Sequence, residues 1–123
     1  MSILKRVFGV LIVIAAAHAL YAQPVNPRAM GAKGDNSTDD TAAIQSAIDS
    51  ASANNGTVTL PEGTYRISAP LVIDAPIHVQ GSRAGTTLNF SSLSSGAALT
   101  IGGSKPIVGA VIEGFTIIGT TTS

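Results

Sequence analysis

Carboxylates are the side chains of this 123-residue sequence whose spacing most suggests chemistry. Asp35, Asp39 and Asp40 form the densest acidic group, and the run Asp35-x-Ser37-x-Asp39 has the outline of a calcium-binding loop. Such a loop also requires a glycine at its sixth place and a glutamate at its twelfth, and this sequence lacks both. We therefore expect the three carboxylates to cap a helix and form a turn, and we predict no metal site there.

The other groups suited to acid–base chemistry have simpler structural interpretations. Glu113 lies next to Gly114 in a predicted strand, and Asp74 lies in a turn near Pro76, so both are expected at solvated positions. His78 alternates with apolar neighbours and should point away from the core, with no partner that the sequence identifies. Proton abstraction from a uronate, or hydrolysis by paired carboxylates, needs groups held together in a site. We accordingly assign no catalytic, cofactor-binding or metal-binding residue.

Composition narrows the class of protein. There is no cysteine, which excludes a disulfide framework, a thiolate metal site and a cysteine nucleophile. Without Lys5 and Arg6, five scattered basic residues stand against seven acidic ones, and they form no stripe that could follow a nucleic-acid backbone. Only 4% of residues are aromatic and 11% are charged, so helical bundles and disordered tails are both poor fits.

The first 22 residues have the layout of a secretory signal peptide. Lys5 and Arg6 precede an apolar run, which ends in small residues before Pro24. The run is shorter than the roughly 20 apolar residues that cross a bilayer. We predict cleavage after Ala22, with cleavage after Ala19 or an uncleaved anchor as alternatives. The mature chain is then expected to be secreted or periplasmic and free of the membrane.

Residues 23–56 are predicted to contain an extended leader and one helix. Pro24 and Pro27 favour an extended start. Apolar residues then recur at helical spacing, which predicts a helix over Asp40–Ala53. Thr38, Asp39 and Asp40 are candidates to cap it, and Asn54-Asn55-Gly56 supplies a left-handed stop; the residues of the apolar stripe are Ala43, Ile44, Ala47, Ile48 and Ala51.

Residues 57–123 change to the alternating pattern of short strands. We predict strands at 57–60, 64–67, 71–73, 77–80, 87–90, 98–101, 111–112 and 115–118. Val79 aligns with Ile101 after 22 residues, a rhythm typical of a solenoid with turns of roughly 20–30 residues. An antiparallel sandwich is the alternative. The helix before the strands favours the solenoid, because it would cover the open apolar end of the first coil.

Two linked motifs carry a resemblance to the pectate lyase superfamily. The segment GAKGDNSTDDTAAIQSAID, residues 31–49, resembles the N-terminal signature of these proteins, and GTVTLPEGTY, residues 56–65, is similar to their GGTVYLPPGTY element. Met30 stands where an aromatic is usual, and Asn36 where a glycine is frequent, although Asn tolerates left-handed backbone. The residues that carry the motifs are assigned a structural role; they are Gly34, Asp35, Asp39, Asp40, Gly56, Pro61, Gly63 and Tyr65.

The resemblance implies an all-β right-handed parallel β-helix with an N-terminal capping helix, of which residues 57–123 form the first two or three coils. It implies a uronate-rich, pectin-like extracellular polysaccharide as partner, and lyase or glycoside hydrolase activity, with calcium used by some full-length members. The alternative is a non-catalytic glycan-binding module of the adhesin or tail-spike kind. Catalytic residues of this family usually lie on later coils. We therefore expect them downstream of residue 123, and expect this chain alone to be inactive.

Overall fold

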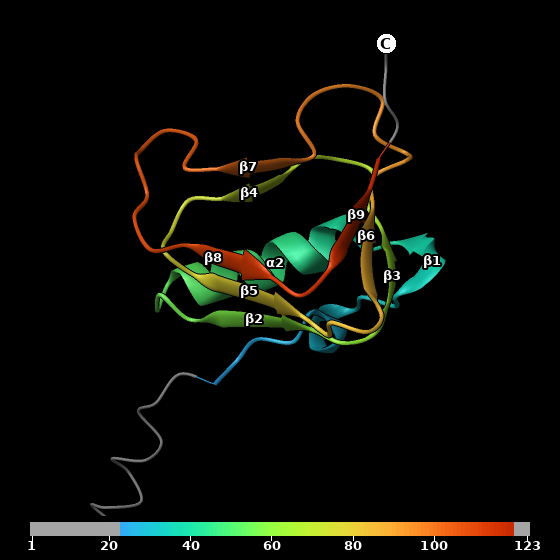
Figure 1. Cartoon of the computed structure of the whole chain (residues 1–123), viewed down its shortest axis with the longest axis horizontal. Helices are drawn as coiled ribbons and strands as arrows, with labels where there is room; N and C mark the ends of the chain where they lie inside the picture. The colour runs from blue at the N-terminus through green and yellow to red at the C-terminus, as the bar shows by residue number, and fades with distance from the viewer. Residues whose placement is uncertain (1–22, 120–123) are drawn as a thin grey trace, which may run out of the picture.

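The computed structural model describes residues 23–119, so the predicted signal peptide lies outside the described part. Within these residues the chain forms a 3-10 turn, an α-helix and nine short strands (Figure 1). The elements are η1 (Pro27–Met30), β1 (Asp35–Asp39), α2 (Thr41–Ser52), β2 (Thr57–Leu60), β3 (Gly63–Arg66), β4 (Leu71–Ile73), β5 (His78–Gly81), β6 (Thr86–Asn89), β7 (Leu99–Ile101), β8 (Val111–Glu113) and β9 (Thr116–Ile118). The predicted class, all-β with one helix, is confirmed.

The strands form three sheets, in the orders β1-β3-β6-β9, β2-β5-β8 and β4-β7. Every strand pair among the described residues is parallel, which excludes the antiparallel sandwich. After β1 the chain visits the three sheets in one fixed order, through β2, β3 and β4, then β5, β6 and β7, and finally β8 and β9. Parallel neighbours need a crossover between them, and here each crossover contains strands of the other two sheets.

The register between strands differs from the predicted rhythm. Val58 pairs with Val79 after 21 residues, and Val79 pairs with Ile112 after 33. The predicted alignment of Val79 with Ile101 is wrong, because Ile101 belongs to another sheet and pairs with Ile73. The segments that follow β6 and β7 are longer than those of the preceding repeat, so the spacing between equivalent strands increases along the chain.

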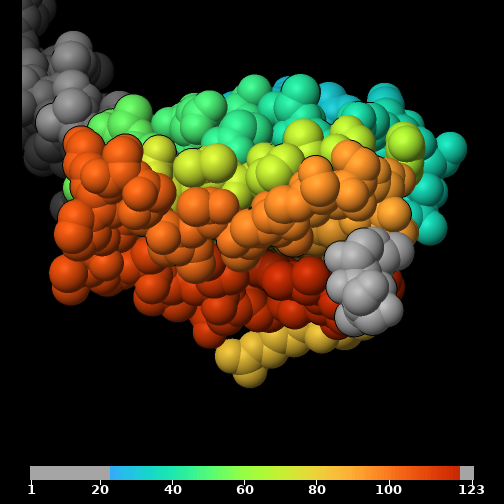
Figure 2. Space-filling model, turned by 90° about the horizontal axis from the view of Figure 1, so that it is seen from above, coloured from blue at the N-terminus to red at the C-terminus, as the bar shows by residue number. Residues whose placement is uncertain are grey.

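The core lies between the three sheets and is closed on one side by α2. Inward residues of the strands stack on one another, and the buried face of α2 consists of Ile44, Ala47, Ile48 and Ala51, which belong to the predicted apolar stripe. Each fully buried Ile or Leu contributes roughly 1.5–3 kcal/mol. In the space-filling view, colours change in bands from blue-green on one side to red on the other, so consecutive segments lie in successive layers (Figure 2).

The first strand of each sheet is covered in a different way. Val25 bridges to β2, where its N–H donates to the Thr57 carbonyl at 2.7 Å and its own carbonyl accepts from the Thr59 N–H at 2.9 Å. Strand β3 is covered by β1. Strand β4 is covered by a side chain of α2: Gln45 Nε2 donates to the Val72 carbonyl at 3.0 Å, and Gln45 Oε1 accepts from the Val72 N–H at 2.9 Å. The amide of Gln45 thus takes the place of a neighbouring strand.

The segment before α2 differs from the predicted extended leader. Pro27–Met30 forms a 3-10 turn whose first residue is preceded by Asn26, and the Asn26 side chain accepts from the Arg28 N–H. Asp35–Asp39, predicted as a turn and helix cap, pairs as strand β1 with β3, although all five of its residues are exposed. A strand with no buried side chain leaves no alternating pattern in the sequence, which explains why this one escaped prediction.

Helix α2 begins and ends within one residue of the predicted bounds. Its C-terminal stop uses Asn55, with φ of 49°, as the left-handed residue, while the Gly56 N–H donates to the Ala51 carbonyl at 2.9 Å. Asn36, expected to tolerate left-handed backbone, has φ of 59°. Both asparagines therefore take a conformation that glycine would otherwise supply.

Candidate functional site

The outer face of the sheet β1-β3-β6-β9 carries a polar group that we call the Arg66 network: Arg66, Ser37, Ser92, Asn36 and Asn89. Arg66 Nε donates to Ser92 Oγ at 3.1 Å, and Arg66 Nη1 donates to the Ser37 carbonyl at 3.2 Å. Asn89 Nδ2 donates to Asn36 Oδ1 at 2.8 Å, joining β6 to β1 across β3. These bonds fix the guanidinium in a planar orientation, which is how arginine presents donors to a carboxylate or a hydroxyl.

Asp35 and Asp39 lie beside this network and are held by local donors. The Thr38 N–H and hydroxyl both donate to Asp35, and the Thr38 N–H is the main reason that the pKa of Asp35 is below its ordinary value. Asp39 accepts from the Ser68 hydroxyl and from the hydroxyl and N–H of Thr41, and the Ser68 bond lowers the pKa of Asp39 most. Hydrogen bonds to a charged carboxylate stabilise the charged form, so both remain ionised well into the acidic range.

These bonds also bear on the calcium that full-length relatives were expected to use. The oxygens of Asp35 and Asp39 already face protein donors. In the part of the chain that the structure describes, no three His, Asp or Glu side chains gather into a group that could hold an ion. Calcium prefers six to eight oxygen ligands. The residues from 23 to 119 therefore do not fit such a site.

Asp40 does not cap the helix as predicted. Its side chain makes no hydrogen bond to the first turn of α2, and only 1% of the residue is exposed. The two carboxylate oxygens instead accept from the N–H groups of Lys33 and Gly34, each at 2.9 Å. The side chain turns back toward the loop before β1, because that loop offers two N–H groups that need partners. The N–H of Thr41 is bound by Asp39.

The second motif holds the turn between β2 and β3. Tyr65 is fully buried, and its hydroxyl donates to the Pro61 carbonyl at 2.7 Å. The guanidinium of Arg28 lies 5.8 Å from the centre of the Tyr65 ring. Gly63 has φ of 150°, and a Cβ there would lie 2.9 Å from the Gly34 carbonyl oxygen. The glycines of the two motifs therefore meet where no side chain fits, and the motif residues bind one another.

The outer face of the sheet β2-β5-β8 carries a histidine–carboxylate contact. His78 Nε2 lies 2.9 Å from Glu113 Oε1, with the two side chains 36% and 45% exposed. Sequence reasoning found no partner for His78, and that expectation is wrong. Glu113 lies 35 residues away on the neighbouring strand β8, and only the correct 33-residue register brings them together. As an exposed pair it contributes at most about 1 kcal/mol to stability.

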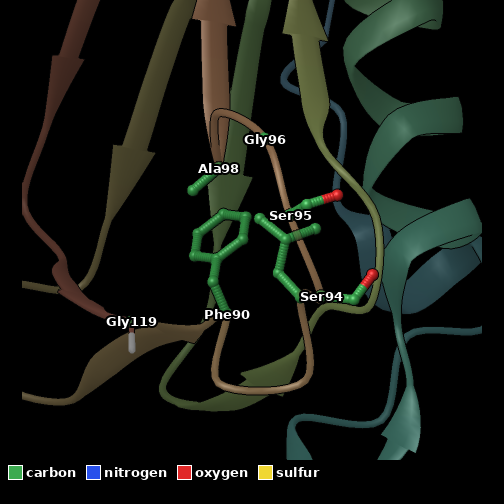
Figure 3. Close-up of a pocket in the computed structure, with 7 residues that line it drawn as sticks. Phe90, Ser94, Ser95, Gly96, Ala98 and Gly119 are labelled. Atoms are coloured by element: carbon green, nitrogen blue, oxygen red, sulfur yellow. The ribbon is translucent and has the colours of Figure 1, made fainter. Parts of the chain in front are cut away.

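A small hollow lies beside the segment that joins β6 to β7 (Figure 3). Its volume is about 120 Å³, and it is lined by Phe90, Leu93, Ser94, Ser95, Gly96, Ala98 and Gly119. Phe90 is almost completely buried and forms its wall next to Ala98. The hollow is smaller than the roughly 300–1,000 Å³ typical of ligand pockets, and none of its lining side chains titrates near neutral pH.

Together these groups can bind sugars more readily than they can break bonds. The outer faces present a fixed guanidinium, amides, hydroxyls and an imidazole, which match hydroxyl and carboxylate oxygens of a polysaccharide. General acid–base catalysis needs donors placed around a reacting atom and shielded from water. Asp74 is exposed after β4, in a different sheet from Glu113, so the two candidate carboxylates do not form a pair on one face.

Comparison with known proteins identifies relatives that act on acidic polysaccharides. The chain is 45% identical over 71 residues to alginate lyase 7 of Azotobacter vinelandii, and equally similar to mannuronan C5-epimerase AlgE2 of the same organism. Each alignment covers 51% of this chain but only 8% and 7% of the relatives, so this chain spans a small part of their length.

A solved structure is also similar. PfbA, a surface adhesin of Streptococcus pneumoniae, superposes with a TM-score of 0.52 and 32% identity, over 55% of this chain and 15% of the adhesin. No helix among residues 23–119 is long and apolar enough to span a membrane.

The family comparison covers most of the chain. Residues 25–117 match the family described as rhamnogalacturonase A/epimerase, pectate lyase-like, a range that includes both motifs and β1–β8 in full. The buried Asp40, the facing glycines and the parallel three-sheet order all lie within it. The chain belongs to the pectate lyase-like rhamnogalacturonase A/epimerase family.

Proposed function

We propose that this chain is the N-terminal region of a secreted protein that acts on an extracellular, uronate-rich polysaccharide, as a lyase or glycoside hydrolase. In this proposal the three parallel sheets are the first coils of a right-handed parallel β-helix, residues 57–123, and α2 is its N-terminal cap. Residues 1–22 are a cleaved signal peptide, and the mature chain is secreted or periplasmic.

The similarity to alginate lyase 7 and the mannuronan epimerases is the observation that carries the substrate class. The first name refers to alginate and the second to mannuronan, both of which are built from uronates, and pectin-like polymers share that carboxylate chemistry. On the outer face of the sheet β1-β3-β6-β9, the guanidinium of Arg66 is held in a fixed orientation by two hydrogen bonds to neighbouring residues. A fixed guanidinium offers a uronate carboxylate two donors in the geometry that it prefers.

Binding to defined polymers tests the substrate class. The 123-residue chain, purified after expression of the whole sequence, would be run in affinity gels that contain polymannuronate, polygalacturonate or a neutral glucan. We expect retardation by at least one polyuronate and none by the glucan. Equal mobility in all three gels would contradict the proposal.

Turnover is measured on the same polymers. We expect no unsaturated uronate and no new reducing ends from the chain alone, because its described residues assemble no acid–base pair around a reacting bond. Longer versions that include downstream sequence are the ones expected to be active. Turnover by the 123-residue chain would overturn the assignment of catalysis to later coils.

The second candidate function is that of a non-catalytic glycan-binding module, and the similarity to a surface adhesin favours it. The two candidates differ in the coils expected downstream of residue 123. Paired aspartates or a basic groove on later coils would support the enzyme. A series of Ser-, Thr- and Asn-rich coils without such groups, together with polymer binding and no turnover by the longer protein, would support the adhesin-like module.

A further inference from the structure

The last strands of the three sheets, β7, β8 and β9, form an end of the molecule that we call the open end. Each is the final strand of its sheet among the described residues, so each has one edge of backbone N–H and C=O groups without a strand partner there. At the opposite end the corresponding edges are covered by Val25, by β1 and by the Gln45 amide. Uncovered strand edges are templates for pairing with another chain.

Side chains show the same asymmetry between the two ends. In the inward stack Tyr65, Leu88 and Ile117, the exposed fraction rises from 0% and 2% to 50%. In the stack of Ile73 and Ile101 it rises from 1% to 51%. Each stack therefore ends on an apolar side chain that lacks the covering residue which the earlier members have.

Outward positions also change from polar to apolar at the open end. Asn89 is followed in register by Ile118, and His78 by Val111, both of which are more than 40% exposed. Glu113 is the one ionisable residue of β7, β8 and β9, and its carboxylate contacts His78. The open end thus has none of the lysines, prolines or inward charges that usually prevent edge pairing.

We propose that the open end is a self-association surface, through which two copies of this 123-residue chain form a closed dimer. Head-to-tail stacking would require an uncovered edge at the other end, and all three edges there are covered. Contact of two open ends about a twofold axis is isologous and closes after two copies. Because Glu113 is compensated by His78, the symmetric contact brings no uncompensated like charges together. The facing strands then run antiparallel, a pairing at least as stable as the parallel one.

The molar mass of the purified chain in solution tests this proposal. Light scattering after size-exclusion chromatography is expected to give twice the monomer mass, falling to the monomer mass on dilution. Ile117→Lys, which places a charge in the open end, should give the monomer at every concentration. Thr59→Lys, which places the same charge on an exposed outward position of β2, is the matched control and should remain dimeric. Circular dichroism shows that both variants fold.

Hydrogen exchange of the unmodified chain gives a second readout that needs no substitution. Amides of β8 and β9 should exchange more slowly at high protein concentration than at low concentration, whereas amides of β2 and β3 should not change. A monomeric mass at all concentrations, a ladder of higher oligomers, or concentration-independent exchange would each overturn the proposal. None of these readouts depends on polysaccharide binding, so the failure of either proposal is distinguishable from that of the other.

Discussion

At the scale of single residues, the two motifs work by satisfying backbone groups. Asp40 is the clearest case, since its carboxylate is buried and holds the N–H groups of Lys33 and Gly34. A buried carboxylate is tolerable only with such donors, and the donors in turn need the carboxylate. The motif aspartate is therefore a fastening point between the loop before β1 and the start of α2.

Replacement of Asp40 should destabilise the fold strongly. Asp40→Ala removes two hydrogen bonds to a charged group and leaves two N–H groups without their partner, so we expect a loss of about 2–4 kcal/mol in the free energy of unfolding. Urea denaturation followed by circular dichroism measures it. Asp74→Asn, at an exposed turn, is the control and should change stability by less than about 0.5 kcal/mol. A comparable loss in both variants would show that Asp40 has no special role.

Asp39 should make stability depend on pH in the acidic range. Its folded-state pKa is lowered from 3.8, chiefly by the Ser68 hydroxyl and then by Thr41. A lowered pKa means that its contribution is fully present above the unfolded-state value and is lost as the pH falls through the folded-state value. The stability difference between the unmodified chain and Asp39→Asn should thus be largest at neutral pH and shrink below about pH 4. Urea midpoints measured from pH 7 downward check this, and a constant difference would contradict it.

At the scale of elements, α2 contributes more than an apolar face. Gln45 holds both backbone groups of Val72, and Thr41 Oγ1 accepts from the Ser68 N–H at 2.9 Å. The polar residues at the edge of the buried stripe therefore satisfy the strand segment that precedes and includes β4. This explains how a helix can border a sheet edge without leaving unpaired backbone groups.

Gln45→Ala tests this role of the helix. Two hydrogen bonds to β4 are lost, and at roughly 0.5–1.5 kcal/mol each we expect a loss of about 1–3 kcal/mol in unfolding free energy. Ser46→Ala, on the exposed face of the same helix, is the matched control and should have little effect. Hydrogen exchange at the Val72 amide gives the specific readout, because it should accelerate only in the Gln45 variant. Unchanged protection of Val72 would mean that the edge is covered in some other way.

The corner between the sheets β2-β5-β8 and β1-β3-β6-β9 is another element-scale constraint. Gly114 has φ of 80°, and a Cβ there would lie 2.6 Å from the Gly81 carbonyl oxygen. Gly114→Ala should cost both the left-handed strain, about 1–2 kcal/mol, and the clash with neighbouring backbone. Gly96→Ala, also left-handed but with no atom within 4 Å of the added carbon, should cost only the strain. Denaturant midpoints of the two variants would distinguish the terms, and equal midpoints would contradict the clash.

Sequence patterns predicted the elements better than their arrangement. The strand at 57–60 and the helix were predicted closely because apolar spacing is a local signal, and Tyr65 was correctly placed in the core. Strand β1 was missed because none of its residues is buried. The contact between His78 and Glu113 was missed because it depends on a 33-residue register set by the long segments after β6 and β7. The role of Asp40 was predicted wrongly because a capping position does not determine where a side chain points.

At the scale of the whole molecule, the apolar stacks predict a gradient of local stability. Inward residues are fully covered near α2 and half exposed at the open end, and regions with few buried contacts open most easily. Native-state hydrogen exchange in a monomeric variant such as Ile117→Lys should give decreasing protection from β2 and β3, through β5 and β6, to β8 and β9. Uniform protection across the nine strands would show that the layers unfold as a single unit.

The covering of every first-strand edge by residues 25–45 also has a consequence for the order of events in time. Each later layer pairs only with the layer before it, and no described strand waits for a partner further toward the C-terminus to complete its earlier edge. A chain that emerges N-terminus first could therefore close its cap, then add β2–β4, β5–β7 and β8–β9 in the order of synthesis. Such vectorial assembly keeps only the newest layer exposed, and limits the interval during which unpaired edges can aggregate.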